Sequence, residues 1–152
     1  MHKFKMLSLF MKLDIHKAFD TVHWGYLLEV LQDLGFGPRW REWVSTLFRT
    51  TSSCAILNGQ KGPSFSHARG IRQGDPLSPM LFILAMDPLQ RLLDMATQQG
   101  MLTPMPPVAA KWRTSMYVDD AAIFINPIKE DVVATKIILE AFGNFSGLHI
   151  NL

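Results

Sequence analysis

Two adjacent acids, Asp119 and Asp120, interrupt an otherwise apolar stretch at residues 115–125. Neighbouring negative charges repel each other and resist burial, so the chain must bring both acids to a surface turn. The strand-like residues on either side predict a β-hairpin with the acids at its tip. This pattern fits an ordinary turn, in which Asp is common, and it also fits a site for a divalent cation.

Hydrophobic spacing along the rest of the chain predicts alternating strands and helices. The expected elements are a strand at 6–14, helices at 27–34 and 38–48, a strand at 52–57, a helix at 78–99, a hairpin at 115–125, a helix at 127–142 and a strand at 148–150. Pro38 is expected to open its helix, and Asn58-Gly59 predicts a tight hairpin turn after the strand at 52–57. This order is close to a βαββαβ sandwich, an α+β fold with an antiparallel sheet covered on one face by helices. Asp14, which ends the first strand, would then lie beside the central hairpin.

Local patterns in the sequence predict the burial or the structural role of several side chains. The helix at 38–48 carries an apolar stripe that we expect in the core, with base stacking as the alternative for its tryptophans. The stripe consists of Trp40, Trp43, Val44, Leu47 and Phe48. The single cysteine, Cys54, excludes an internal disulfide and is expected to be buried in its strand. Ser78 is expected to cap the long helix that follows it.

Asp14, Asp119 and Asp120 form the first candidate site. Carboxylate oxygens suit Mg²⁺, and two such ions can activate a hydroxyl and stabilise a leaving group in phosphoryl transfer. On this hypothesis Asp14 and Asp119 bridge the two ions, and Asp120 supports them.

The loop at residues 68–76 (ARGIRQGDP) forms the second candidate site. Its two glycines allow close approach of backbone to a ligand, and its two arginines can neutralise phosphate. Gln73 offers an amide to a base or sugar edge. A plain surface turn is the alternative, although the position just before a helix favours an anion.

Charge and composition narrow the classes of partner. The chain has 152 residues, of which 48% are hydrophobic and 18% charged, which indicates one folded domain. Residues 1–76 hold ten basic and six acidic residues, whereas residues 77–152 hold five and seven. A basic half beside acidic motifs suits a phosphate-bearing partner, with scattered solvated charge as the alternative. No stretch approaches the ~18 apolar residues of a membrane span, and no signal peptide is predicted.

Three blocks of the sequence resemble the palm region of reverse transcriptases from non-LTR (LINE-type) retrotransposons, particularly those of plants. Residues 12–20 (KLDIHKAFD) resemble motif A, residues 70–79 (GIRQGDPLSP) resemble motif B, and residues 117–120 (YVDD) resemble motif C. The resemblance covers essentially the whole chain. Motif C departs from the pattern of this class, which usually has Ala at the position of Val118.

This resemblance implies a role for each candidate residue. The catalytic metal ligands would be Asp14, Asp119 and Asp120, and the ring of Phe19 would exclude a 2′-hydroxyl. The contacts to the incoming nucleotide and the template would come from Arg72, Gln73 and Gly74.

The implied function is RNA-directed DNA polymerase activity, in which dNTPs are added to a primer 3′-hydroxyl. The implied cofactors are two Mg²⁺ ions, with Mn²⁺ as an alternative metal. The implied partners are an RNA template, a DNA primer, dNTPs and the remainder of the element's polyprotein, without a membrane. The resemblance implies a nuclear or cytoplasmic location, whereas the sequence itself leaves the location unknown.

Residues 1–152 correspond to a partial domain, the palm, and the fingers and thumb of the family are expected to lie outside it. Positioning supplies much of the rate in phosphoryl transfer, so we expect this chain alone to be inactive. The alternative function is therefore an inactive retrotransposon-derived fragment that at most binds nucleic acid weakly. A nucleotide cyclase-like palm is a third interpretation, in which motif B has no place.

Overall fold

The computed structural model describes residues 8–105, 113–117 and 120–151. Along the chain they form β1 (Leu9–Ile15), α1 (Ala18–Thr21), α2 (Trp24–Asp33), α3 (Pro38–Arg49), β2 (Ser52–Leu57), β3 (Gln60–Ser66), α4 (Ser78–Gln98), β4 (Thr114–Tyr117), β5 (Asp120–Ile125), α5 (Lys129–Ser146) and β6 (Ile150–Asn151). Each predicted element is present within a few residues of its expected bounds. The short helix α1 was not predicted. No helix in these ranges is long and apolar enough to cross a membrane.

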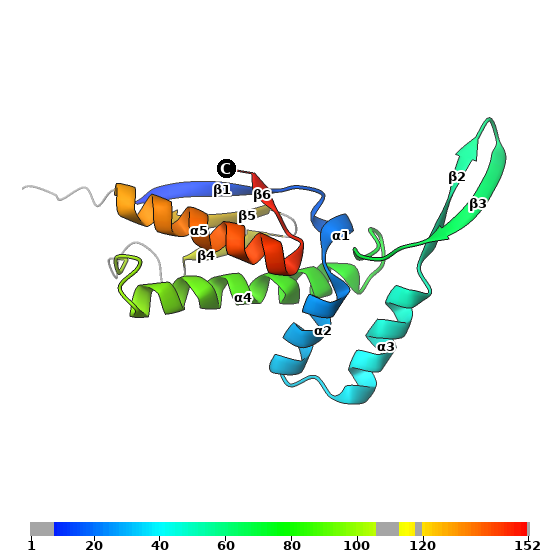
Figure 1. Ribbon diagram of the computed structural model, residues 1–152, viewed down its shortest axis with the longest axis horizontal. Helices are drawn as coiled ribbons and strands as arrows, with labels where there is room; N and C mark the ends of the chain where they lie inside the picture. Colours follow the sequence, from blue (N-terminus) through cyan, green and yellow to red (C-terminus); the bar gives the residue numbers. More distant parts are fainter. Residues whose placement is uncertain (1–7, 106–112, 118–119, 152) are drawn as a thin grey trace, which may run out of the picture.

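The main sheet has four antiparallel strands in the order β4-β5-β1-β6. Strand β1 pairs with β5 from Leu9 opposite Ile125 to Leu13 opposite Ala121. Its other edge meets the short β6, where Asp14 lies opposite Asn151. Helices α4 and α5 cover one face of this sheet (Figure 1). The predicted antiparallel sheet with helices on one face is therefore confirmed.

Alternation along β1 decides which side chains enter the core. Leu13 and Ile15 are 1% and 8% exposed and pack in the hydrophobic cluster with the helices. Phe10 and Asp14, at alternate positions, are exposed. Successive strand residues point to opposite faces, so the metal-binding candidate Asp14 lies on the face that the helices leave open.

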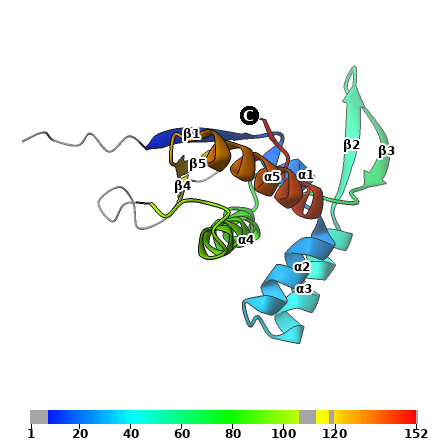
Figure 2. The ribbon, with the colours of Figure 1, turned by 60° about the vertical axis from the view of Figure 1, so that its left-hand side comes forward.

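The hairpin β2–β3 forms a separate sheet that projects from the body of the molecule (Figures 1 and 2). Its turn residues, Asn58 and Gly59, have φ of 50° and 78°. Positive φ at both positions matches the tight hairpin turns that fit the twist of paired strands. The Asn-Gly pair therefore explains the predicted turn.

Three expectations about burial are wrong, because none of the described elements covers the outer sides of α3 and the hairpin. Val44 and Phe48 are buried as predicted, but Trp43 and Leu47 are 57% and 50% exposed. Cys54 lies in β2 as expected, yet it is only half-buried. An apolar stripe thus identified the helix correctly but not the extent to which it is covered.

The start of α4 also differs from the expectation for Ser78. The residue at the cap position is Leu77, and no side chain caps the helix. The Ser78 hydroxyl instead donates to the carbonyl of Arg72 at 2.6 Å, and the Asp75 carboxylate accepts from the Leu77 amide at 2.9 Å. Ser78 therefore fixes the preceding loop rather than the helix end.

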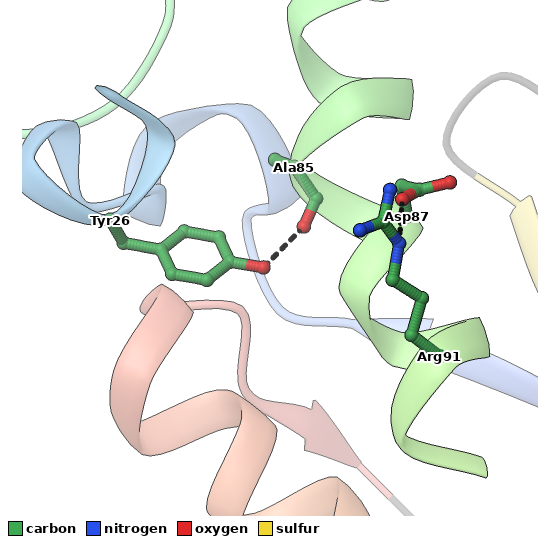
Figure 3. A network of polar contacts seen from close by, with 4 residues as sticks. All are labelled: Tyr26, Ala85, Asp87 and Arg91. Atoms are coloured by element: carbon green, nitrogen blue, oxygen red, sulfur yellow. Dashed lines mark hydrogen bonds and ion pairs between the residues drawn. The ribbon is translucent and has the colours of Figure 1, made fainter. Parts of the chain in front are cut away.

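A half-buried tyrosine joins α2 to α4 (Figure 3). The Tyr26 hydroxyl donates to the Ala85 carbonyl at 2.7 Å, and its ring meets Phe142 of α5 edge-on at 6.2 Å. Burial raises the pKa of Tyr26, and the nearby Asp87 carboxylate adds to this effect. Asp87 is itself paired with Arg91 at 2.8 Å.

Candidate functional site

The strand register brings Asp14 and Asp120 to the same level of the sheet. Leu13 pairs with Ala121, and Asp14 and Asp120 are the next residues beyond that pair. Strand β4 adds Tyr117 opposite Asp120. Two of the three predicted metal ligands therefore lie on neighbouring strand ends. Asp119 falls outside the described residues, so its place beside Asp14 stays a prediction.

Asp14 borders a hollow of about 260 Å³, which we call the Asp14 hollow. Its lining consists of Leu13, Asp14, Ile15, Lys17, Ala18, Phe19 and Gln73. The Asp14 side chain is exposed and makes no hydrogen bond or ion pair with any described residue. Its oxygens are therefore available to a ligand.

The Asp14 hollow brings together residues from two separate blocks of the sequence. Asp14 and Phe19 come from the first block, and Gln73 comes from the second. One face of Phe19 stacks on Phe82 of α4, with ring centroids 5.0 Å apart and planes at 28°. This packing fixes the ring as a half-buried wall of the hollow.

A short ladder of hydrogen bonds holds the second block against the first. The amide of Ile71 donates to the Phe19 carbonyl at 2.7 Å, and the amide of Gly70 donates to the Val22 carbonyl at 2.8 Å. The Trp24 indole donates to the Gly70 carbonyl at 2.6 Å. Gln73 thus reaches the Asp14 hollow because the loop before it is bonded to the segment that follows β1.

The two glycines of the loop have different surroundings. Both have left-handed backbone, with φ of 86° at Gly70 and 87° at Gly74. A Cβ on Gly70 would lie 2.6 Å from the Asp20 carbonyl oxygen, whereas a Cβ on Gly74 would meet nothing within 4 Å. Gly70 is therefore required by packing, and Gly74 faces open space that a ligand could enter.

A second hollow, of about 370 Å³, lies at the base of the projecting hairpin, and we call it the hairpin-base hollow. Its lining consists of Asp20, Thr51, Ser53, His67, Arg69, Gly70, Ile71, Arg72 and Gln73. Of the predicted loop residues, Arg72 lines this hollow, Gln73 lines both hollows, and Gly74 lines neither. No local pattern singles out Ser53 or His67, since pairing across the hairpin is what brings them to its base.

The end of the chain packs behind the same turn. The amide of His16 donates to the His149 carbonyl at 3.0 Å, and the amide of His23 donates to the Ser146 carbonyl at 2.8 Å. Between these contacts Gly147 turns the chain with φ of 81°. These bonds hold the chain between His16 and His23, which directly follows the end of β1 that bears Asp14.

Comparisons with known proteins match the whole chain to one family profile and match parts of it to proteins of transposable elements. The family profile described as reverse transcriptase (RNA-dependent DNA polymerase) matches residues 1–152. An uncharacterized 149 kDa protein of transposon TX1 from Xenopus laevis is 39% identical over 88 residues, covering 57% of this chain and 7% of that protein. The Pol polyprotein of retrotransposable element R2 from Nasonia vitripennis is 37% identical over 81 residues, covering 53% of this chain and 8% of the polyprotein.

Among solved structures, an apo telomerase from Candida tropicalis, truncated from its C-terminal domain, matches with a TM-score of 0.68. The match has 17% identity and covers 97% of this chain and 30% of that one. It shows a shared fold and so confirms the predicted palm-like polymerase fold. The chain spans less than a tenth of the two element proteins and under a third of the telomerase chain.

Proposed function

Because the chain belongs to the reverse transcriptase (RNA-dependent DNA polymerase) family, we propose that it is the palm of an RNA-directed DNA polymerase from a non-LTR retrotransposon. In this reaction dNTPs are joined to a DNA primer along an RNA template. One observation carries the proposal most directly. Asp14, Phe19 and Gln73, which come from two distant blocks, line a single hollow.

Asp14, Asp119 and Asp120 are the proposed ligands of two Mg²⁺ ions, which Mn²⁺ could replace. The donor chemistry supports this assignment, since the Asp14 carboxylate is exposed beside the hollow and unbonded within the described structure. The position of Asp120 next to it in the register supplies a second carboxylate-bearing residue. When bound, such ions activate a hydroxyl and neutralise charge on phosphate.

The remaining site residues are proposed to bind and orient the nucleotide. The fixed ring of Phe19 would limit the space beside the sugar, because its packing on Phe82 prevents it from turning away. Gln73 would offer its amide to a base or sugar edge, and Arg72 would neutralise phosphate. Gly74 would allow the backbone to approach the nucleotide or the template closely.

Metal binding tests the site without requiring catalysis. We expect the chain to bind Mn²⁺ in an electron paramagnetic resonance titration, and we expect Asp14→Asn and Asp119→Asn to weaken binding at least tenfold. Asp20→Asn is the matched control, because Asp20 is an exposed acid six residues further on that lines the other hollow. Wild-type affinity in the Asp14→Asn variant would contradict the assignment.

Primer extension on an RNA template in Mg²⁺ tests the activity itself. Extension that depends on Asp14 and Asp119 would support polymerase function for this chain. Metal binding without extension would instead favour the alternative of an inactive fragment, since positioning of the substrates is then missing.

A further inference from the structure

We infer that Gln90 of α4 is a positioning residue of the candidate site. In this assignment its hydrogen bonds fix the register of β4 on β5, and so the place of the turn that carries the proposed metal ligands. The importance of that turn rests on the proposed polymerase function, whereas the register of the strand does not.

Strand β4 is short and lies at the edge of the main sheet, next to α4 (Figures 1 and 2). Among the described strands, its four residues pair with β5 alone. Two of the facing residues, Ala121 and Ala122, have small side chains that give little cross-strand contact. A slip of two residues would leave each side chain on its own face, so the hydrophobic pattern excludes it only weakly. The register of β4 therefore needs support from outside the sheet.

Gln90 contacts one residue of β4 through two hydrogen bonds. Its Oε1 atom accepts from the amide and from the hydroxyl of Thr114, at 3.0 and 2.5 Å. Met116, the next residue of β4 on the same face, has no hydroxyl to donate. The Nε2 atom of Gln90 donates to the Asp94 carboxylate at 2.7 Å, which keeps the amide oxygen directed at β4. Both bonds of Gln90 are therefore satisfied only when Thr114 occupies its observed place.

Arg113 supports the same end of β4 from the residue before the strand. It is 5% exposed, and its guanidinium donates to the Thr103 carbonyl. Its own carbonyl accepts from the Phe124 amide at 2.8 Å, which extends the pairing with β5. Burial lowers the pKa of Arg113, and the neighbouring Asp131 and Asp94 carboxylates oppose this effect. The two carboxylates thus offset part of the cost of burying the charge.

Asp131 of α5 holds the acceptor of Arg113 in place. It is 1% exposed and accepts from the amide and the hydroxyl of Thr103, both at 3.0 Å. It also accepts from the Asn126 side chain at 3.1 Å, and the same Asn126 amide donates to the Thr103 carbonyl at 3.0 Å. The start of β4 is therefore joined by polar contacts to both helices that cover the sheet.

The effect on the candidate site passes along β4. The lining of the Asp14 hollow contains none of these polar residues in the described structure. Three residues beyond Thr114, however, Tyr117 faces Asp120, and the register of β5 on β1 brings Asp120 to the level of Asp14. Buried polar contacts are a costly way to gain stability, but they can specify one arrangement among several. Their concentration at the start of β4 therefore favours a role in register.

Gln90→Met tests the register and the metal site together. Methionine offers only a weak acceptor in place of the amide oxygen that Thr114 contacts. The register is measured by the nuclear Overhauser effect between the α-protons of Thr114 and Ile123, a close facing pair next to the bond between Phe124 and Arg113. Metal affinity is measured by Mn²⁺ titration with electron paramagnetic resonance. We expect this variant to lose the effect and to bind Mn²⁺ about tenfold more weakly, as is typical when outer-shell support of metal ligands is removed.

Gln32→Met is the matched control, because Gln32 also accepts a side-chain hydrogen bond, from Arg41, but lies on α2. It should keep both the Overhauser effect and the Mn²⁺ affinity of the unmodified chain. Urea unfolding establishes that each variant is folded under the conditions of the titration.

Two substitutions of Thr114 separate positioning from stability. Thr114→Val removes the hydroxyl that Gln90 accepts from, and Thr114→Ser keeps a hydroxyl. Valine favours strands, so a purely structural role predicts no loss of Mn²⁺ affinity in Thr114→Val. We expect Thr114→Val to show the changes of Gln90→Met to a smaller extent, and Thr114→Ser to behave as the unmodified chain.

The inference is overturned if Gln90→Met keeps the Thr114–Ile123 contact, or if the contact is lost while Mn²⁺ affinity is unchanged. Should Gln90→Met fail to fold, the same two measurements on Thr114→Val decide the matter. If the unmodified chain binds no Mn²⁺, the proposed metal site fails, whereas loss of the contact in Gln90→Met would still support the role of Gln90 in the register.

Discussion

The indole nitrogen of Trp24 donates a hydrogen bond to the carbonyl of Gly70 at 2.6 Å, and so joins α2 to the loop that carries Gln73. The same indole stacks on Phe48 of α3, with centroids 5.4 Å apart and planes at 12°. One side chain therefore connects both helices of the α2–α3 pair to the candidate site.

Trp24→Phe should keep an aromatic ring against Phe48 but remove the donor to Gly70. We expect the free energy of unfolding to fall by about 1–2 kcal/mol, because a partly buried carbonyl loses its partner. Urea denaturation followed by circular dichroism measures this change. An unchanged midpoint would show that the bond does not hold the loop.

Gly70→Ala and Gly74→Ala compare two glycines with nearly the same backbone conformation. Both alanines would be strained at positive φ, but only the one at position 70 would also collide with the Asp20 carbonyl. We expect Gly70→Ala to destabilise the chain by at least about 1 kcal/mol more than Gly74→Ala. Equal thermal shifts for the two variants would argue against the close packing of the loop on α1.

Phe19→Val tests the proposed sugar discrimination in any form of the protein that extends primers. The smaller side chain should admit a 2′-hydroxyl, so the ratio of kcat/KM for dNTPs to that for ribonucleotides should fall roughly tenfold or more. Steady-state incorporation assays measure this ratio. Phe10→Val serves as the control, because Phe10 is an exposed ring on the same chain that does not line the hollow. A ratio that is unaffected by Phe19→Val would remove this role.

Tyr26 should make the stability fall at alkaline pH. Its pKa is raised in the folded chain, mainly by burial, so the unfolded chain ionises first, above its ordinary value of about 10. The contribution of the neutral Tyr26 phenol to the free energy of unfolding is thus complete below about pH 10 and declines as pH rises above that value. Urea unfolding at pH 9 and at pH 11 should show this loss in the wild type and a smaller one in Tyr26→Phe. Equal losses in both proteins would contradict the assignment to Tyr26.

Local signals in the sequence predicted the parts of the fold that depend on neighbouring residues. The Asn58-Gly59 turn needs only two positive φ values, and Pro38 starts α3 as expected. The antiparallel pairing of β1 with the later hairpin followed from the order of the elements, and the register confirmed it for Leu13 and Ala121.

Properties that depend on distant parts of the chain could not be predicted in the same way. Trp43 has the spacing of a core residue, but its exposure depends on whether another element covers α3. Ser78 has the chemistry of a cap, but its hydroxyl found a nearer acceptor in the Arg72 carbonyl. The hairpin-base hollow depends on Ser53 meeting His67 across two strands, which no local pattern specifies.

The register between β1 and β5 also has a kinetic consequence. Leu13 and Ala121 are more than a hundred residues apart in sequence, so their pairing must close a very long loop. Hairpin β2–β3 and the α2–α3 pair involve only short loops and should form early during refolding. The end of the sheet at which Asp14 and Asp120 lie on neighbouring strands would then form late. In pulse-labelled hydrogen exchange, the amides of β1 should gain protection after those of α2.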